Sequence, residues 1–508
     1  MAKNRRSFEP VTIFLILILI TIAVSYIGYL LNWQGTYERL NLITGASETT
    51  SVMVENLFSV DGLQFLIANA TRNFASFAPL VSIIIAFMGI GIIEKSGLFH
   101  ALFGRLKEAP LRTITFVVIL LSVIFSVFND VGFVLVMPLA ALVFLLVGRN
   151  PIAGIIASFA GVTGGASINL FISSLDFNLS DYTNAAAQLI DPAYVVNPNS
   201  NWYLIILATI LITIAATIIT EKFVIPRLGE YKKVEEIELD DEPKIGRGLI
   251  FSGIASTIYL GLIVYMIVPI QRIGGGVLLD RNEEMFLNQL LGYNSFFSQG
   301  ITFILAFLLI IAGLFYGIGA KTIRNDKQFV TATNSAMKDI SRILVLMFFV
   351  AQFIALYRKS NIGTLINVNI VNLIESLNFS GLALVILIFL AAAIGNLFLT
   401  STTATWSIMA PVVVPVAMMD SITPEFTQAI FRAGDSVTNG LTPLLVYFVV
   451  YIALIQKYNL AALKETSYIK SLKMIIPYTL AFTFVWLVIL ISWYYIGLPI
   501  GPGVFPNI

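Results

Sequence analysis

The sequence predicts an all-α polytopic membrane protein with nine transmembrane helices, two re-entrant helical hairpins and an inverted repeat that contains broken helices. Of its 508 residues, 58% are hydrophobic and only 12% are charged, about half the charged share of a soluble domain. Apolar runs of about 18 to 25 residues recur along the chain, and each can cross a hydrocarbon core of roughly 30 Å. We therefore expect a single transmembrane domain over residues 1–508.

The composition excludes several classes of function. A formal net charge of +1 gives no electrostatic reason to expect a nucleic-acid partner. The absence of cysteine and the single histidine, His100, exclude thiolate chemistry, disulfides and histidine-rich metal sites. What remains is oxygen, amide, guanidinium and backbone chemistry among membrane lipids.

The first apolar run, residues 11–31, follows Lys3, Arg5 and Arg6. It is too long for the apolar region of a signal peptide, so we expect a retained helix with a cytoplasmic N-terminus. Residues 61–79 are weakly amphipathic and predict an interfacial or partly buried helix. The other predicted spans are residues 80–93, 151–175, 202–220, 249–270, 297–318, 343–356, 427–456 and 474–496, with residues 457–508 forming a cytoplasmic loop and the last helix.

Two apolar stretches, residues 113–147 and 382–419, are too long for one crossing, and each has a small polar break near its middle. Either stretch can be two crossings or a re-entrant hairpin. Under both interpretations 23 of the 30 basic residues lie on the cytoplasmic side, and six lie in outside loops, Arg358 and Lys359 among them. Charge therefore orients the chain but does not distinguish the two interpretations.

A single displacement of the sequence aligns Pro151 with Pro424 and Gly161 with Gly434, and it brings the two polar breaks into register. Few identities support this repeat, but the order of its elements is the same in both halves. Each half has an apolar stretch with a polar tip, then a helix that starts with proline, then a polar interruption of that helix. The two units cover about residues 113–176 and 382–456.

The interruptions at residues 161–169 and 434–443 lie in helices that we expect to enter from opposite sides of the membrane. Inverted repeats with broken helices are typical of secondary transporters, and the broken segments mark the binding site. Irregular backbone at that depth is tolerated only where protein or a wet cavity satisfies it. The alternative is that small residues merely allow close helix packing. The small residues concerned are the glycines of the two interruptions, Gly161, Gly164, Gly165 and Gly434.

Arg432 and Asp435 lie three residues apart in a long apolar run, where each charge is costly. On a helix they share a face, so one interpretation is a buried ion pair that neutralises itself. The other gives Asp435 the task of holding a hard cation such as Na⁺. Arg432 would then bind an anionic substrate, because its planar guanidinium suits a carboxylate.

Polar groups at the second hairpin tip also have two interpretations each. Asn396 offers an amide oxygen to a cation or makes an interhelical hydrogen bond. The hydroxyls of Ser401, Thr402, Thr403 and Thr405 either bind carboxylate oxygens beside a half-helix N-terminus or cap that helix. Trp406 either stacks on an aromatic ligand or is an ordinary packed aromatic residue.

Two aspartates lie near the first interruption. Asp130, with Asn129, lies at the first hairpin tip, where it either caps a helix or belongs to the site. Asp176 closes the helix after the interruption, at a loop edge where aspartates are common.

These motifs resemble those of the AbgT family of p-aminobenzoyl-glutamate transporters. The likeness covers almost the whole chain, and its most specific part is residues 432–439, Arg-Ala-Gly-Asp-Ser-Val-Thr-Asn, followed by Thr442-Pro443. The resemblance implies a bowl-shaped homodimer with nine transmembrane helices and two hairpins in each subunit. It implies cation-coupled movement of p-aminobenzoyl-glutamate and, for some members, export of sulfonamide antimetabolites.

The family's functional positions fall on identical residues of this chain. The resemblance implies a sodium site at Asn396 and Asp435. It places the substrate path at Asp176, Trp406, Pro424, Arg432 and Pro443, and Asn439 lies in the signature itself.

We therefore expect a secondary transporter, coupled to Na⁺ or H⁺, that crosses the inner (cytoplasmic) membrane of the cell several times. Its partners would be an aromatic carboxylate or sulfonamide, membrane lipids and a second copy of the chain, with no cofactor besides the coupling ion. One alternative is a transporter of another carboxylate with the same plan. An anion channel is a second, although no filter-like motif is present. An intramembrane aspartyl enzyme is a third, but Arg432 one turn from Asp435 disfavours a shared proton.

Overall fold

The computed structural model describes residues 8–42, 46–128, 130–231, 244–269, 275–283, 285–292, 294–461 and 468–508. Within these ranges eight helical segments are long and apolar enough to cross a membrane, or nine when the bent pair α14 and α15 counts as one span. The predicted class, a helical polytopic membrane protein, is confirmed.

The first helices are α1 (Pro10–Leu30), α2 (Val60–Ala75), α3 (Ala78–Ser96), α4 (Leu98–Phe103), α5 (Leu111–Phe125), α6 (Met137–Leu146), α7 (Pro151–Gly164), α8 (Ser174–Ala187), α9 (Trp202–Ile219) and α10 (Ile225–Leu228). The remaining helices are α11 (Ile245–Ile267), α12 (Phe286–Leu291), α13 (Phe296–Ala320), α14 (Asp326–Lys359), α15 (Ile362–Leu377), α16 (Gly381–Asn396), α17 (Thr402–Met419), α18 (Pro424–Val437), α19 (Phe448–Ala461) and α20 (Tyr468–Ile496).

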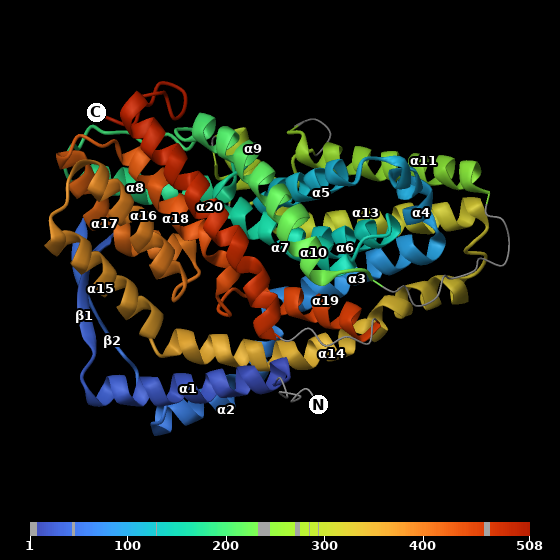
Figure 1. Ribbon diagram of the computed structural model, residues 1–508, viewed down its shortest axis with the longest axis horizontal. Coiled ribbons are helices and arrows are strands. Elements are labelled where there is room, and N and C mark those ends of the chain that lie inside the picture. The colour runs from blue at the N-terminus through green and yellow to red at the C-terminus, as the bar shows by residue number, and fades with distance from the viewer. Residues whose placement is uncertain are drawn as a thin grey trace.

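One antiparallel pair of strands interrupts the helical pattern. β1 (Gln34–Leu40) pairs with β2 (Ser47–Met53), and Gln34 lies opposite Met53. The pair packs against α15 and α17 at one end of the molecule (Figure 1). The sequence pattern predicted no strand here, because this polar stretch carries little hydrophobic periodicity.

Helices α1 and α2 pack along α14 at one long edge of the molecule (Figure 1). Helix α14 continues to Lys359, and α15 begins at Ile362 after a bend of 48°. The predicted span, residues 343–356, is therefore only part of a longer helix. Arg358 and Lys359, which the charge pattern assigns to an outside loop, lie at the bend between two apolar helices.

The element bounds repeat with the displacement that the sequence suggested. The shift that carries Pro151, the first residue of α7, onto Pro424 of α18 also carries the last residue, Gly164, onto Val437. Each helix is followed by a short 3-10 turn, at Gly165–Ser167 and Asn439–Leu441. Helix α7 packs against α5 and α6, and α18 packs against α16 and α17 in the same way.

Side-chain contacts repeat as well. Asn169 Nδ2 donates to the Ile124 carbonyl over 3.1 Å, and Thr442 Oγ1 donates to the Leu397 carbonyl over 2.9 Å. The same displacement relates both members of the second pair to those of the first. In each half, a residue near the end of the interruption therefore fastens the chain to the end of the hairpin's first arm.

Candidate functional site

Both hairpin tips and both helix interruptions line one cavity of about 410 Å³. The first half contributes Asp130 and most of residues 165–169, and the second contributes residues 400–403 and Asn439. Two full crossings would leave the polar breaks at the membrane surface. Because the breaks instead meet the middles of the interrupted helices, the arrangement fits the re-entrant hairpins.

The C-terminal ends of α7 and α18 meet beside this cavity. Ser167 Oγ, just after α7, donates to Ser436 Oγ in the last turn of α18 over 2.6 Å. Gly440 follows α18 and lies against Phe159 and Thr163 of α7. Helix C-terminal ends carry a partial negative charge and unpaired carbonyls, so this junction favours a cation.

Asn396 joins the hairpin to the second interruption. Its amide Nδ2 donates to the Asp435 carbonyl over 2.7 Å, to Asn439 Oδ1 over 3.0 Å and to Thr438 Oγ1 over 3.2 Å. Three surrounding acceptors fix the orientation of the amide. Thr402, at the tip, donates to Asp435 Oδ2 over 2.7 Å. The tip and the interrupted helix are therefore tied together through the predicted sodium-site residues.

Two oxygens in this cluster have no hydrogen-bond partner among the residues that the structure describes. Asn396 Oδ1 and Asp435 Oδ1 are both buried and unsatisfied, in side chains that are 0% and 2% exposed. An orphaned buried oxygen is costly unless it has a ligand. Among the described residues no group of three or more His, Asp or Glu side chains forms a transition-metal site. The oxygen-only donors fit a hard cation such as Na⁺.

Arg432 forms a buried ion pair with Asp176, and both side chains are at most 7% exposed. In the described part of the chain it forms no ion pair with Asp435, so the suggested local pair is wrong. The other Asp176 oxygen accepts from the backbone N–H and the hydroxyl of Ser173, both over 2.7 Å. This capping box at the start of α8 fixes the carboxylate that orients Arg432.

Trp406 does not line the cavity. Its indole is fully buried, stacks on Phe431 with a centroid distance of 4.5 Å, and donates to Thr183 Oγ1 over 2.9 Å. The geometry matches the packed-aromatic interpretation. Phe431 directly precedes Arg432, so this stack packs against the turn of α18 that carries the arginine.

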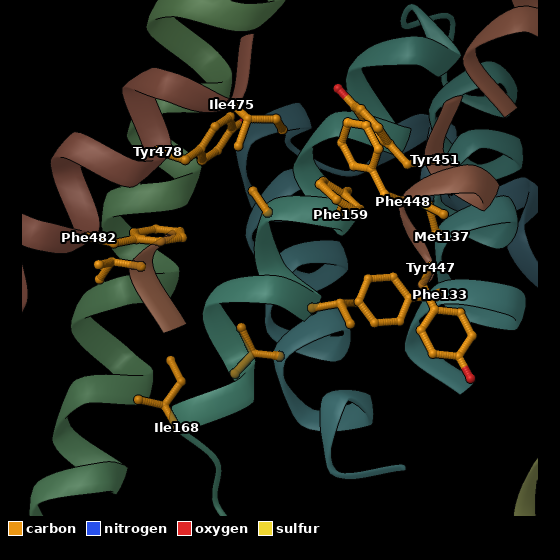
Figure 2. Close-up of a cluster of buried hydrophobic side chains, with 14 of the residues drawn as sticks. Phe133, Met137, Phe159, Ile168, Tyr447, Phe448, Tyr451, Ile475, Tyr478 and Phe482 are labelled. Atoms are coloured by element: carbon orange, nitrogen blue, oxygen red, sulfur yellow. The ribbon is translucent and has the colours of Figure 1, made fainter. Parts of the chain in front are cut away.

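Asp130 lies at the first tip and is satisfied by hydroxyl groups. Ser82 of α3 donates to one of its oxygens over 2.8 Å, and Tyr447 donates to the other. The Tyr447 ring stacks on Phe133 at 4.8 Å, at the edge of the aromatic cluster in Figure 2. Its predicted neighbour Asn129 lies outside the described residues.

The predicted glycines all pack tightly. A Cβ on Gly161 would lie 2.8 Å from Ser122 Cβ, and one on Gly165 would lie 2.7 Å from Ser126 Oγ. Phe482 covers Gly164, and the Phe389 carbonyl covers Gly434. Close packing accounts for these four positions, and Gly165 also lines the cavity.

The remaining predicted residues occupy helix ends. Pro424 is the first residue of α18, which Thr423 caps by accepting from the Phe426 N–H over 3.3 Å. Pro443 is the last residue of the second interruption and is half-buried. Ser401 lines the cavity and caps α17 by accepting from the Ala404 N–H.

Sequence reasoning missed Arg358, whose side chain lines the same cavity from the bend between α14 and α15. The signal was present, because a basic pair followed by a new apolar helical run is unusual for an outside loop.

The comparisons with known proteins identify the family. Residues 5–507 match the model of the AbgT putative transporter family. The chain is 32% identical, over 464 residues, to the p-aminobenzoyl-glutamate transport protein of Escherichia coli (strain K12), and the match covers 91% of this chain and 89% of that relative.

Two solved structures are similar. The YdaH transporter of Alcanivorax borkumensis is 31% identical, covers 97% of this chain and 100% of its own, and has a TM-score of 0.49. MtrF of Neisseria gonorrhoeae, described as an antimetabolite efflux pump, is 32% identical, covers 99% and 98%, and has a TM-score of 0.48. The curated relative is a transport protein and not an enzyme, as the sequence predicted. The chain belongs to the AbgT putative transporter family.

Proposed function

We propose that this protein is a cation-coupled secondary transporter of p-aminobenzoyl-glutamate or a closely related aromatic carboxylate. The observation that carries the proposal is one cavity that joins both tips, both interruptions and the buried Arg432. Its volume of about 410 Å³ suits a small organic ligand. The substrate is the one named for the E. coli relative.

We further propose Na⁺ as the coupling ion, held by the orphaned oxygens of Asn396 and Asp435 and by nearby backbone carbonyls. Bound there, Na⁺ would supply positive charge and neutralise the buried carboxylate. Thr402 connects Asp435 to the second tip, so ion binding orders the residues that close the cavity. By linkage, ion and substrate then raise each other's affinity by the same factor.

The substrate would bind on the other side of the second tip. The start of α17 presents N–H groups and the Ser401 and Thr403 hydroxyls to a carboxylate. Arg432 lines the cavity beside them, oriented by Asp176. Phe133 and Val162 form an apolar wall that suits the aminobenzoyl ring.

The test is flux of radiolabelled p-aminobenzoyl-glutamate in proteoliposomes, with sodium and proton gradients imposed separately. We expect accumulation against the substrate gradient that requires the sodium gradient and is competed by excess unlabelled substrate. A sulfonamide serves as the second competitor. Asp435→Asn and Arg432→Gln should abolish accumulation, whereas Glu48→Gln, at an exposed position of β2, should not change it.

Accumulation by both Asp435→Asn and Arg432→Gln at normal rates would contradict these roles. Dissipative flux without accumulation under either gradient would favour a channel, and recovery of cleaved substrate would favour an enzyme.

The assembly and the membrane are part of the proposal. We propose a homodimer in an inner membrane with cytoplasmic N-termini. The distribution of basic residues supports the orientation, and the resemblance described above implies the dimer. Light scattering of the purified protein in detergent measures the assembly state.

A further inference from the structure

The bend between α14 and α15 presents two consecutive basic residues with different surroundings. Lys359 forms an ion pair with Glu55, and its ammonium lies over the Phe65 ring. Arg358 lines the cavity, and within the described part of the chain its exposed guanidinium forms no hydrogen bond or ion pair. The bend thus uses one cation to hold the fold and leaves the other unpaired in the cavity.

The bend is fixed, so the direction of Arg358 is not accidental. The Glu55 N–H donates to the Ser360 carbonyl over 3.1 Å. Asn361 Nδ2 donates to the Met53 carbonyl over 3.2 Å. These bonds fasten the two residues that follow Lys359 to the end of β2 and the segment after it, so the last turn of α14 has a defined rotation.

The charged side chains around the cavity differ in whether they have an ion-pair partner. Arg432 is balanced by Asp176, and both oxygens of Asp130 accept from hydroxyl groups. Among the cations that line the cavity in the described structure, Arg358 alone has no carboxylate partner. The hydroxyl groups satisfy Asp130 without neutralising its charge, and in the described structure it forms no ion pair with Arg358. A substrate with one carboxylate can bind at the tip beside Arg432, and a second carboxylate on the same substrate can then pair with Arg358.

We infer that Arg358 binds the second carboxylate of a dianionic substrate and makes the transporter selective for dianions over monoanions. The inference rests on the proposed function and adds a specificity-determining residue to it. Arginine suits this role because its fork of N–H groups matches both oxygens of a carboxylate. Its exposure at the cavity suits capture of the substrate from water.

The experiment compares equilibrium binding of p-aminobenzoyl-glutamate and p-aminobenzoyl-glutamine to the purified protein. The second ligand has an amide in place of the side-chain carboxylate and is otherwise the same shape. We expect the unaltered protein to prefer the dianion about tenfold, the size of a charge-assisted hydrogen bond reduced by exposure. Arg358→Gln should lose this preference by weakening only the dianion, and Arg358→Lys should retain part of it.

Lys359→Gln is the matched control, because it removes the neighbouring charge at the same bend and should keep the tenfold preference. If Arg358→Gln keeps the preference, or weakens both ligands equally, Arg358 does not bind the second carboxylate. If the unaltered protein binds neither ligand saturably, the proposed function fails and takes this inference with it. Binding of both ligands with no preference overturns the inference alone.

Discussion

Replacing Asn396 with alanine tests the proposed sodium site most directly. The side chain is 0% exposed, and its amide donates three hydrogen bonds, to the Asp435 carbonyl, Thr438 and Asn439. The amide has two N–H groups to share among these three acceptors, so at about 1 kcal/mol for each net bond the substitution should cost about 2 kcal/mol of stability. It also removes Oδ1, the orphaned oxygen that we assign to the ion.

The loss of Oδ1 distinguishes an ion ligand from a residue with only a structural role. An ion that binds only the folded state adds stability, about 2.7 kcal/mol when its concentration is 100 times Kd. The unaltered protein in detergent should therefore melt at a higher temperature in sodium chloride than in choline chloride of equal ionic strength. Asn396→Ala should lower the melting temperature in both salts and remove the difference between them.

Asn367 of α15 provides the matched control. It is also 0% exposed, has an orphaned Oδ1, and donates to the Gly363 and Gly395 carbonyls over 3.0 and 3.2 Å. Asn367→Ala should cost about 2 kcal/mol for its two bonds and leave the sodium-dependent difference intact. If Asn396→Ala keeps that difference, or Asn367→Ala loses it equally, Asn396 Oδ1 is not a sodium ligand.

Two further substitutions address packing and the ion pair, both measured by thermal stability in detergent. Gly434→Ala places a Cβ 2.9 Å from Ala392 Cβ and should lower the free energy of unfolding by about 1–3 kcal/mol. Gly253→Ala, where no heavy atom of the described residues lies within 4 Å, should be neutral or slightly stabilising. Equal stabilities of the two variants would refute the packing role of Gly434. Asp176→Asn or Arg432→Met alone should lower the free energy of unfolding by about 3–5 kcal/mol, because each leaves a buried charge unpaired. The double variant should lose less than the sum of the two single losses. Strictly additive losses would contradict the ion pair.

The spans, the two polar breaks and the repeat were predictable because each rests on local composition. Scarce charge made Arg432 and Asp435 conspicuous, and both belong to the cluster around the cavity. The partner of Arg432 was not predictable. Helical spacing reveals neighbours three or four residues away, whereas Asp176 lies 256 residues earlier and meets Arg432 only through the packing of α8 on α18.

The surroundings of Arg358 and Trp406 escape sequence reasoning for related causes. A hydropathy window ends a span at a charged pair, so it predicts a loop after Lys359, although an apolar helix resumes at Ile362. Position beside a tip suggests that Trp406 faces a ligand, but its ring packs against Phe431 of α18 instead. Sequence gives depth along a helix more readily than the direction in which a side chain points.

The repeat also explains why the proposed ion site belongs to one half only. The displacement that relates Pro151 to Pro424 places Val123 where Asn396 lies and Val162 where Asp435 lies, and both valines are buried. The two halves share helix bounds and contacts, yet only the second half carries the oxygen donors at this position. Because a buried carboxylate is tolerated only with compensation, retaining Asp435 in one half while valine fills the other indicates a dedicated ligand. The same backbone plan therefore supports close packing in one half and carries the proposed cation site in the other.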